Sequence, residues 1–169
     1  NGGYIRQLPV DDFTRRAIPF LERDLPPDVP RPLPLDYVRQ IMPLAQERAK
    51  LLGEVTPLSR YFFVEKLEYD PALLISKGMT PESTIPALEV SKERLAKMEV
   101  FDAMALEAML RPLAEELQLK TGQLFGSLRT AVSGETATPP LFQMMAVLGR
   151  ERCLHRIEEA INRLKRPPP

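Results

Sequence analysis

The chain has 169 residues, of which 44% are apolar, with 23 basic and 23 acidic side chains. This length can bury a core in one domain or two small ones. No apolar run approaches the ~20 residues of a membrane-spanning helix, and a net charge of zero argues against unspecific nucleic-acid binding. We therefore expect neither a membrane nor DNA as a partner. A single cysteine excludes an intrachain disulfide and favours a reducing, cytoplasmic setting.

The spacing of apolar residues predicts helices throughout, and no alternating pattern indicates a strand. The expected helical segments before residue 120 are, in chain order, about 9–23, 35–52, 55–66, 71–76 (a short turn), 81–98 and 102–118. The prolines between residues 26 and 34 predict a stiff connector. Four further prolines fall inside helical patterns and are expected to kink or interrupt them: Pro19, Pro43, Pro86 and Pro112.

The last third, residues 120–164, predicts three more helices joined by two turns. Thr121 is an N-cap candidate, and Gly134 suits the left-handed residue that ends a helix. Thr138-Pro139-Pro140 begins the second helix with proline in the first turn, where a missing N–H costs nothing. Gly149 separates it from the third helix. This arrangement leaves one polar corner, around Arg129 and Thr138.

The domain organisation follows from these elements. The loop from Ser76 to Thr80 is the best boundary between two halves of the chain. We expect an all-α protein of two small subdomains, residues 1–77 and 78–169, built from short, proline-punctuated helices.

Residues 120–166 carry a local charge of +4 and the first 119 residues −4. A polyanion would prefer the C-terminal end, although solvated helix faces are the commoner origin of such a difference.

The chain lacks the residues of a complete active site. His155 is the only histidine, so a paired-histidine metal site or a histidine-based triad cannot be assembled without it. Cys153 lies two positions away on a helix and points elsewhere, which favours a core cysteine beside a surface histidine. No glycine-rich phosphate loop is present. We expect no metal or cofactor in this chain.

Binding remains as the candidate activity. Arginines and turn backbones next to aromatic rings read unstacked RNA bases by hydrogen bonding and stacking. Such residues gather at two places: Arg129, Thr138, Leu141 and Phe142 in one, and Arg48 ahead of Arg60-Tyr61-Phe62-Phe63 in the other. Simpler explanations exist for each. The phenylalanines are more often core, and Arg48 could pair with Glu47 or Glu54.

At this point the residues resemble the C-terminal anticodon-binding region of bacterial-type glutamyl-tRNA synthetases, over nearly the whole chain. The strongest match is Leu-Lys-x-Gly-Gln-x-x-x-x-Leu-Arg-x-Ala-x-(Thr/Ser)-Gly, followed by Pro-Leu-Phe and Leu-Gly-(Lys/Arg)-Glu-Arg, within residues 119–164. Gln46-Glu47-Arg48 with Tyr61-Phe62-Phe63 is a weaker match. The start, Asn1 to Arg6, resembles the segment that follows the family's catalytic half. Because the first residue is Asn, we expect a piece of a longer enzyme.

The resemblance implies an anticodon-reading role for five residues: Arg48, Arg129, Thr138, Pro139 and Leu141. An arginine at position 48 reads the first anticodon base and helps exclude glutamine tRNA; the other four match positions that contact the second and third bases. The implied partner is the anticodon loop of a glutamate tRNA, bound by a monomer. Two departures from the family are Ser133, where threonine is common, and Pro140, where a glycine would keep an N–H.

The resemblance also implies what is missing. The family's adenylation site needs a His-x-Gly-His signature and a Lys-Met-Ser-Lys-Ser loop, and this chain has neither. It is therefore expected to bind tRNA without activating glutamate, while ATP and Mg²⁺ belong to the catalytic part of the ligase. Two alternatives stay open. One is a helical protein–protein interaction module; the other is an enzyme that charges both glutamate and glutamine tRNAs, against which Arg48 speaks.

Overall fold

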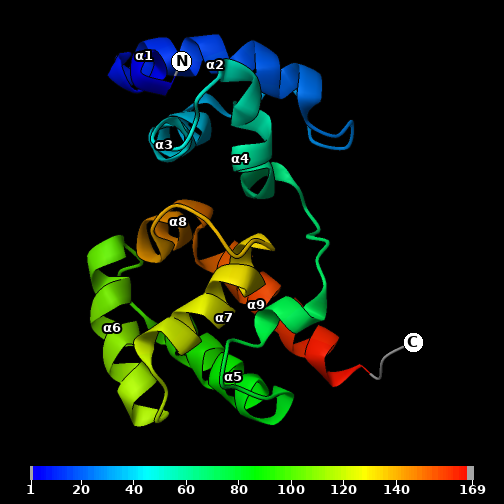
Figure 1. The fold of residues 1–169 in the computed structure, drawn as a ribbon, viewed down its shortest axis with the longest axis vertical. Helices are drawn as coiled ribbons and strands as arrows, with labels where there is room; N and C mark the ends of the chain where they lie inside the picture. Colours follow the sequence, from blue (N-terminus) through cyan, green and yellow to red (C-terminus); the bar gives the residue numbers. More distant parts are fainter. Residues whose placement is uncertain (1, 167–169) are drawn as a thin grey trace. The chain divides into compact units, whose positions relative to one another are not determined.

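The computed structural model describes residues 2–166, and all regular structure within them is helical, which confirms the all-α prediction (Figure 1). No helix in this range is long and apolar enough to cross a membrane. The chain divides into two compact units, Asn1–Lys66 and Leu67–Pro169. This division comes earlier than the expected boundary at residue 77, because the short 3₁₀ helix η2 (Pro71–Leu74) packs on α7 (Thr121–Ser133) and α9 (Arg150–Lys165) of the second unit.

The first unit consists of four α-helices and one 3₁₀ turn. These are α1 (Gly2–Gln7), α2 (Val10–Asp24), α3 (Leu35–Gln46), η1 (Leu52–Glu54) and α4 (Val55–Phe63). Helix α2 packs against α3 and α4, and their apolar stripes bury Phe13, Leu21, Ile41 and Phe62. Helix α1 was not expected. The buried side chain of Gln46 holds its end, since Nε2 donates to the carbonyl oxygens of Ile5 and Leu8, both at 2.8 Å.

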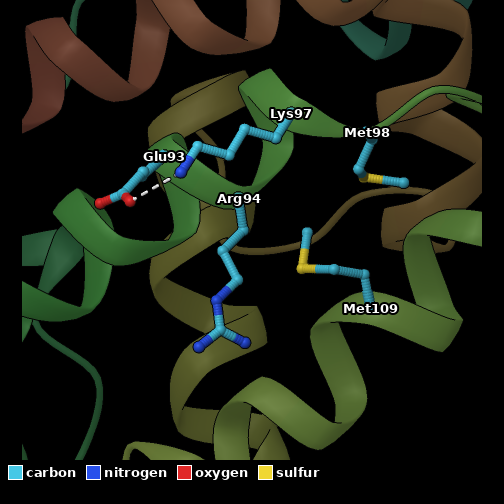
Figure 2. Close-up of a pocket in the computed structure, with 5 residues that line it drawn as sticks. All are labelled: Glu93, Arg94, Lys97, Met98 and Met109. Carbon is cyan, nitrogen blue, oxygen red and sulfur yellow. Dashed lines mark hydrogen bonds and ion pairs between the residues drawn. The ribbon is translucent and has the colours of Figure 1, made fainter.

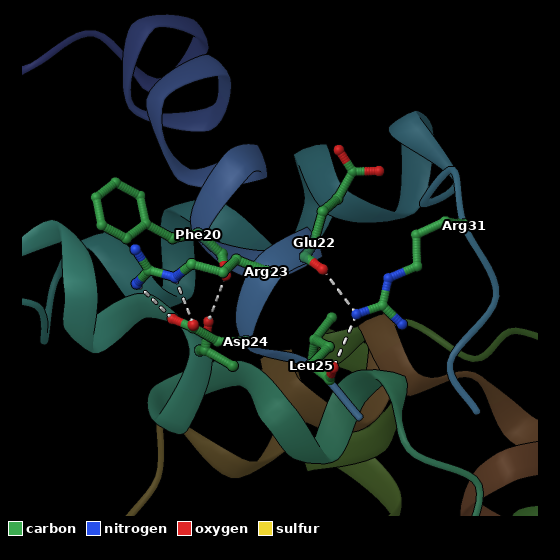
Figure 3. Close-up of polar contacts among 7 residues, drawn as sticks. Phe20, Glu22, Arg23, Asp24, Leu25 and Arg31 are labelled. Atoms are coloured by element: carbon green, nitrogen blue, oxygen red, sulfur yellow. Dashed lines mark hydrogen bonds and ion pairs between the residues drawn. The ribbon is translucent and has the colours of Figure 1, made fainter. Parts of the chain in front are cut away.

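Arg31 fastens the proline connector between α2 and α3 (Figure 3). Its guanidinium donates to the carbonyl oxygens of Glu22 and Leu25 at the end of α2, both at 2.8 Å. It also donates to those of Pro26 and Val29, at 2.7 and 2.5 Å. Carbonyls in the last turn of a helix lack partners within the helix, and a cation there also matches the helix dipole. The connector is thus tied to the end of α2.

Helix α3 ends at Gln46, well before the expected end at residue 52, so Arg48 lies on a turn and not on a helix. The carboxylate of Glu54 accepts the backbone N–H groups of Lys50 and Leu51, both at 2.7 Å. These bonds replace the ones that a continued helix would make. The N–H groups of Leu51 and Lys50 also hold the pKa of Glu54 below its usual value, because they stabilise the charged form.

The second unit contains η2 and five α-helices. They are α5 (Pro81–Lys97), α6 (Ala103–Glu116), α7, α8 (Leu141–Leu148) and α9. Helix α9 packs along α5 and α7, and α8 lies beside α6 (Figure 1). Their shared core includes Leu88, Leu95, Leu124, Met145 and Ile157.

The four interior prolines do not interrupt their helices, so the expected interruption is wrong. Pro19, Pro43, Pro86 and Pro112 lie inside α2, α3, α5 and α6, respectively. A proline removes one backbone donor and releases one carbonyl. Three of these rings are exposed, so that the affected backbone is on the solvent side of the helix, while buried residues such as Ala17 and Leu21 anchor α2 on both sides of its proline.

Two arginines of α9 bind the ends of neighbouring helices. Nη1 of Arg150 donates to the carbonyl oxygen of Leu95 near the end of α5, at 2.7 Å. Nη1 of the buried Arg156 donates to the carbonyl oxygen of Val132 near the end of α7, at 2.7 Å. Each cation sits where helix carbonyls lack partners. Part of the local charge of +4 is therefore engaged within the unit.

Candidate nucleic-acid interface

The structure brings Arg129, Thr138 and Pro139 together. Arg129 lies on α7 and is half-buried. Its Nη1 donates to Oγ1 of Thr138 and, at 2.9 Å, to the carbonyl oxygen of Pro139. Oγ1 of Thr138 in turn donates to the Pro139 carbonyl at 2.7 Å. Because a guanidinium presents its donors in a rigid plane, this cluster fixes the turn that enters α8 relative to α7.

Ser133 and Gly134 begin the same turn. Oγ of Ser133 donates to the carbonyl oxygen of Arg129 at 2.6 Å and accepts the N–H of Glu135 at 3.0 Å. Gly134 has a φ of 74°, which confirms its prediction as a left-handed helix end. A Cβ there would lie 3.2 Å from Cδ1 of Tyr69, a tight contact from which the ring would have to shift, so conformation is the main reason for glycine here.

Tyr69 packs against this turn and is itself held by α9. The guanidinium of Arg163 lies 4.5 Å from the Tyr69 ring centroid, and its Nη2 donates to the carbonyl oxygen of Leu67 at 2.5 Å. Burial raises the pKa of Tyr69. Sequence reasoning missed this support because Leu67 and Arg163 are 96 positions apart.

Pro139 and Leu141 are buried, and Leu141 is only 3% exposed. The second helix of the last third begins at Leu141, with Pro140 as its N-cap, so the expected proline in the first turn is wrong. The reason is the cluster around Arg129, which draws Thr138 and Pro139 into a turn. Leu141 therefore offers a backbone N–H and not its side chain, since the first N–H groups of a helix lack partners within it. Pro139 has no N–H, and its carbonyl accepts from Arg129 and Thr138.

Two half-buried phenylalanines lie next to the start of α8. Phe125 and Phe142 meet edge to face, with ring centroids 5.1 Å apart. The guanidinium of Arg111 lies 5.4 Å from the Phe125 centroid. Phe62 and Phe63 of the first unit are buried, as the simpler explanation predicted. Of these four rings, Phe125 and Phe142 are therefore partly accessible to a ligand, whereas Phe62 and Phe63 are not.

Arg48 is exposed on the turn after α3, in the first unit. Its backbone N–H donates to the carbonyl oxygen of Ala45 at 3.1 Å, which closes the last turn of the helix. Arg48 and Arg129 thus belong to different compact units. Arg48 lies on a turn whose backbone Glu54 bonds, whereas Arg129 lies on a helix and bonds the turn that follows it.

Cys153 and His155 are placed as expected from their spacing. Cys153 is buried, and burial raises the pKa of its thiol to about 12, whereas His155 is exposed. Within residues 2–166 no group of three or more His, Cys, Asp or Glu side chains is arranged to hold a metal ion.

A hollow of about 240 Å³ lies between α5 and α6 (Figure 2), lined by Glu93, Arg94, Lys97, Met98 and Met109. Its cations are paired: Nζ of Lys97 lies 3.2 Å from Oε1 of Glu93, and Nη1 of Arg94 lies 2.5 Å from Oε2 of Glu116. This lining contains no nucleophile and no acid–base pair aimed at a substrate.

Comparison with known proteins agrees with this geometry. The chain is 51% identical over 168 residues to "Glutamate--tRNA ligase" of Dehalococcoides mccartyi (strain CBDB1), covering 99% of the chain and 34% of the relative. It is 46% identical over 163 residues to the protein of the same name from Roseiflexus castenholzii, covering 96% of the chain and 32% of the relative. The chain thus spans about a third of the length of these curated relatives.

The fold matches a solved structure as well. A crystal structure of a glutamate tRNA ligase from Elizabethkingia meningosepticum, in complex with its amino acid, superposes with a TM-score of 0.81 at 23% identity. The match covers 98% of this chain and 31% of that one, and it concerns the fold alone. The family model described as "Anticodon binding domain" matches residues 12–161. The chain therefore belongs to the anticodon-binding domain family, as its resemblance to that region of the synthetases predicted.

Proposed function

We propose that this chain recognises the anticodon loop of a glutamate tRNA as part of a longer glutamate–tRNA ligase. The family and the names of the relatives support this assignment. The structural observation that carries it is the cluster of Arg129, Thr138 and Pro139, which holds an arginine and a helix start at one polar corner.

The corner has the chemistry that base reading requires. A guanidinium offers planar donors that match the acceptors on a base edge, and the start of α8 offers backbone N–H groups. Unstacked loop bases expose such edges, in contrast to bases in an RNA duplex. Arg129, Thr138, Pro139 and Leu141 would contribute to contacts with the second and third anticodon bases, Leu141 through its backbone N–H and Pro139 by holding Arg129 and Thr138 with its carbonyl.

Arg48 would read the first anticodon base, which distinguishes glutamate tRNA from glutamine tRNA. Its exposure on a turn supports this role, because the side chain is accessible to a ligand and its backbone N–H is bonded to Ala45. An enzyme with relaxed specificity would bind both tRNAs alike. A protein–protein module would show no dependence on the anticodon at all.

Charging of tRNA would be the work of the longer ligase, with ATP and Mg²⁺ in its catalytic part. For this chain alone we expect tRNA binding without cofactors, no activation of glutamate, and a monomer that acts in the cytoplasm, where translation takes place. Sedimentation velocity checks the monomer, and ATP–pyrophosphate exchange with glutamate checks the absence of activation.

The decisive experiment is a titration of the full chain with a glutamate tRNA transcript and with transcripts that carry one altered anticodon base each. We expect each altered base to weaken binding by ~1–3 kcal/mol at moderate salt. A transcript of the glutamine tRNA tests the first base in a natural context. Equal affinity for all transcripts would contradict base reading and favour one of the two alternatives.

A further inference from the structure

An exposed leucine stands on the turn that carries Arg48. Leu51 is 61% exposed, although it is a large apolar residue on a well-defined turn of the first unit. Lys50 beside it is exposed as well. This turn carries two cations, Arg48 and Lys50, and two carboxylates, Glu47 and Glu54, the second of which is engaged by the backbone of the turn. An exposed apolar side chain next to an exposed lysine is suited to an unstacked nucleotide, which has an apolar base face and a flanking phosphate.

The carboxylate of Glu54 holds the backbone of this turn in place. It accepts the N–H groups of both Lys50 and Leu51 at 2.7 Å, as charge-assisted hydrogen bonds. Two consequences follow. The backbone donors of these residues are engaged by Glu54, so an RNA ligand would meet the turn through its side chains. The side chain of Leu51 also leaves the turn from a backbone that is already ordered, which lowers the entropy lost on binding.

We propose that Leu51 packs against the face of an anticodon-loop nucleotide adjacent to the one read by Arg48, with Lys50 near a flanking phosphate and Glu54 as the positioning residue of the turn. This proposal rests on the proposed function, because it extends the same binding surface. Leu51 and Lys50 then contribute affinity, whereas discrimination between first bases stays with Arg48.

Alanine substitution of Leu51 tests the contact. The full chain carrying Leu51→Ala is titrated with the glutamate tRNA transcript and with a transcript whose anticodon loop is replaced by a short unrelated loop. We expect about fivefold weaker binding to the intact transcript, the value for partial burial of a leucine, and no change with the replaced loop. The matched control is Leu35→Ala, which removes another exposed leucine of the same unit (46% exposed) and should leave both affinities unchanged.

Substitutions of Glu54 test the positioning role. We expect Glu54→Ala to weaken binding of the intact transcript by an amount similar to Leu51→Ala, and Glu54→Gln, which keeps an acceptor oxygen, to restore most of the affinity. Glu65→Ala is the charge control, because Glu65 is an exposed carboxylate of the same unit. Melting curves show whether Glu54→Ala remains folded. If Glu54→Ala unfolds, the proposal is judged by comparing the affinities of Leu51→Ala and Leu35→Ala.

The outcomes separate the two proposals. If the unsubstituted chain binds intact and replaced-loop transcripts equally, anticodon recognition fails and the role of Leu51 fails with it. If the unsubstituted chain prefers the intact transcript while Leu51→Ala behaves like Leu35→Ala, only the role of Leu51 is overturned. An equal loss of affinity for both transcripts also overturns it, since the contact would then lie outside the anticodon loop.

Discussion

Arg48 lies on the turn after α3, whereas Arg129 lies on α7 and bonds the turn between α7 and α8, and the two turns are supported very differently. In the first unit one carboxylate, Glu54, holds the turn through two backbone N–H groups, and the side chains of Arg48 and Leu51 are exposed. In the second unit Arg129 itself bonds the turn, and Leu141 is buried. The comparison teaches that the first turn is held by a separate residue, Glu54, while the second is held by the arginine that is itself proposed to read a base. Substitution of the exposed Arg48 or Leu51 should therefore cost less stability than substitution of Arg129.

The largest effect is expected at Leu141. Because this side chain is 3% exposed in the core beneath α8, Leu141→Ala should lower the free energy of unfolding by ~2–5 kcal/mol. Urea denaturation followed by circular dichroism measures the change. The control is Leu73→Ala, an exposed leucine of the same unit (45%), which should cost far less. Equal costs would mean that position 141 is not part of the core.

Arg129→Ala should weaken binding of glutamate tRNA by ~1–3 kcal/mol and relax selection at one anticodon base. It should also lower stability, because the Pro139 carbonyl loses its charged donor. Titration with base-substituted transcripts and a denaturation curve measure the two effects. Lys97→Ala, which removes an exposed cation of the same unit away from this turn, is the control. A uniform loss of affinity across all transcripts would reduce Arg129 to a phosphate contact.

Gly134→Ala should destabilise the second unit by about 1–2 kcal/mol, the usual cost of a side chain in the left-handed region. The contact of the new Cβ with Tyr69 at 3.2 Å adds to this cost. Thermal unfolding measures the change. In the Tyr69→Leu background, Gly134→Ala should cost less than it does in the unsubstituted chain, because the tight contact is gone. An equal cost in both backgrounds would mean that the backbone conformation accounts for the whole effect.

Arg48→Gln should reduce the preference for the first base of the glutamate anticodon by about tenfold, ~1.4 kcal/mol. Stability should stay within ~0.5 kcal/mol, because Arg48 is an exposed surface residue. Competition between glutamate and glutamine tRNA transcripts measures the preference. Arg39→Gln on the exposed face of α3 is the control. A clear loss of stability would mean that Arg48 helps to hold its own turn, as Arg129 does in the second unit.

The smallest effect is expected from the titration of Glu54. Its folded pKa is depressed, so its contribution is present above the pKa of the unfolded state, ~4.3, and is lost as pH falls through the folded pKa. Glu54→Gln should therefore melt at a lower temperature than the unsubstituted chain at pH 7, and the difference should shrink in acid. Melting curves at several pH values measure it. A difference independent of pH would mean that the charge is not what holds the turn.

Much of this fold could be predicted from local sequence, because helix periodicity and glycine caps act over a few residues. Gly134 and the stripes of α5, α6 and α9 are such cases. The early end of α3 could not be predicted, since Leu44, Ala45 and Ala49 continue a helical pattern. The capture of two N–H groups by Glu54 outweighs that pattern.

The candidate site was predictable to a similar extent. Spacing placed Arg129 and Thr138 at one corner, and the structure joins them. The burial of Pro139 and Leu141 was not visible, because a proline–leucine pair at a helix start looks the same whether it faces solvent or core. The support from Tyr69 and Arg163 depends on contacts between distant segments, which no local pattern reports.

The placement of the α9 arginines has a consequence for how fast RNA would be captured. Arg150 and Arg156 lie against carbonyl groups at helix ends, where the partial negative charge of the backbone cancels part of their field. Long-range attraction scales with the field that reaches solvent, not with the number of cations in the sequence. Lowering the ionic strength should therefore raise the association rate of tRNA with this unit only slightly. Differences in affinity between tRNAs should then appear mainly in the dissociation rate.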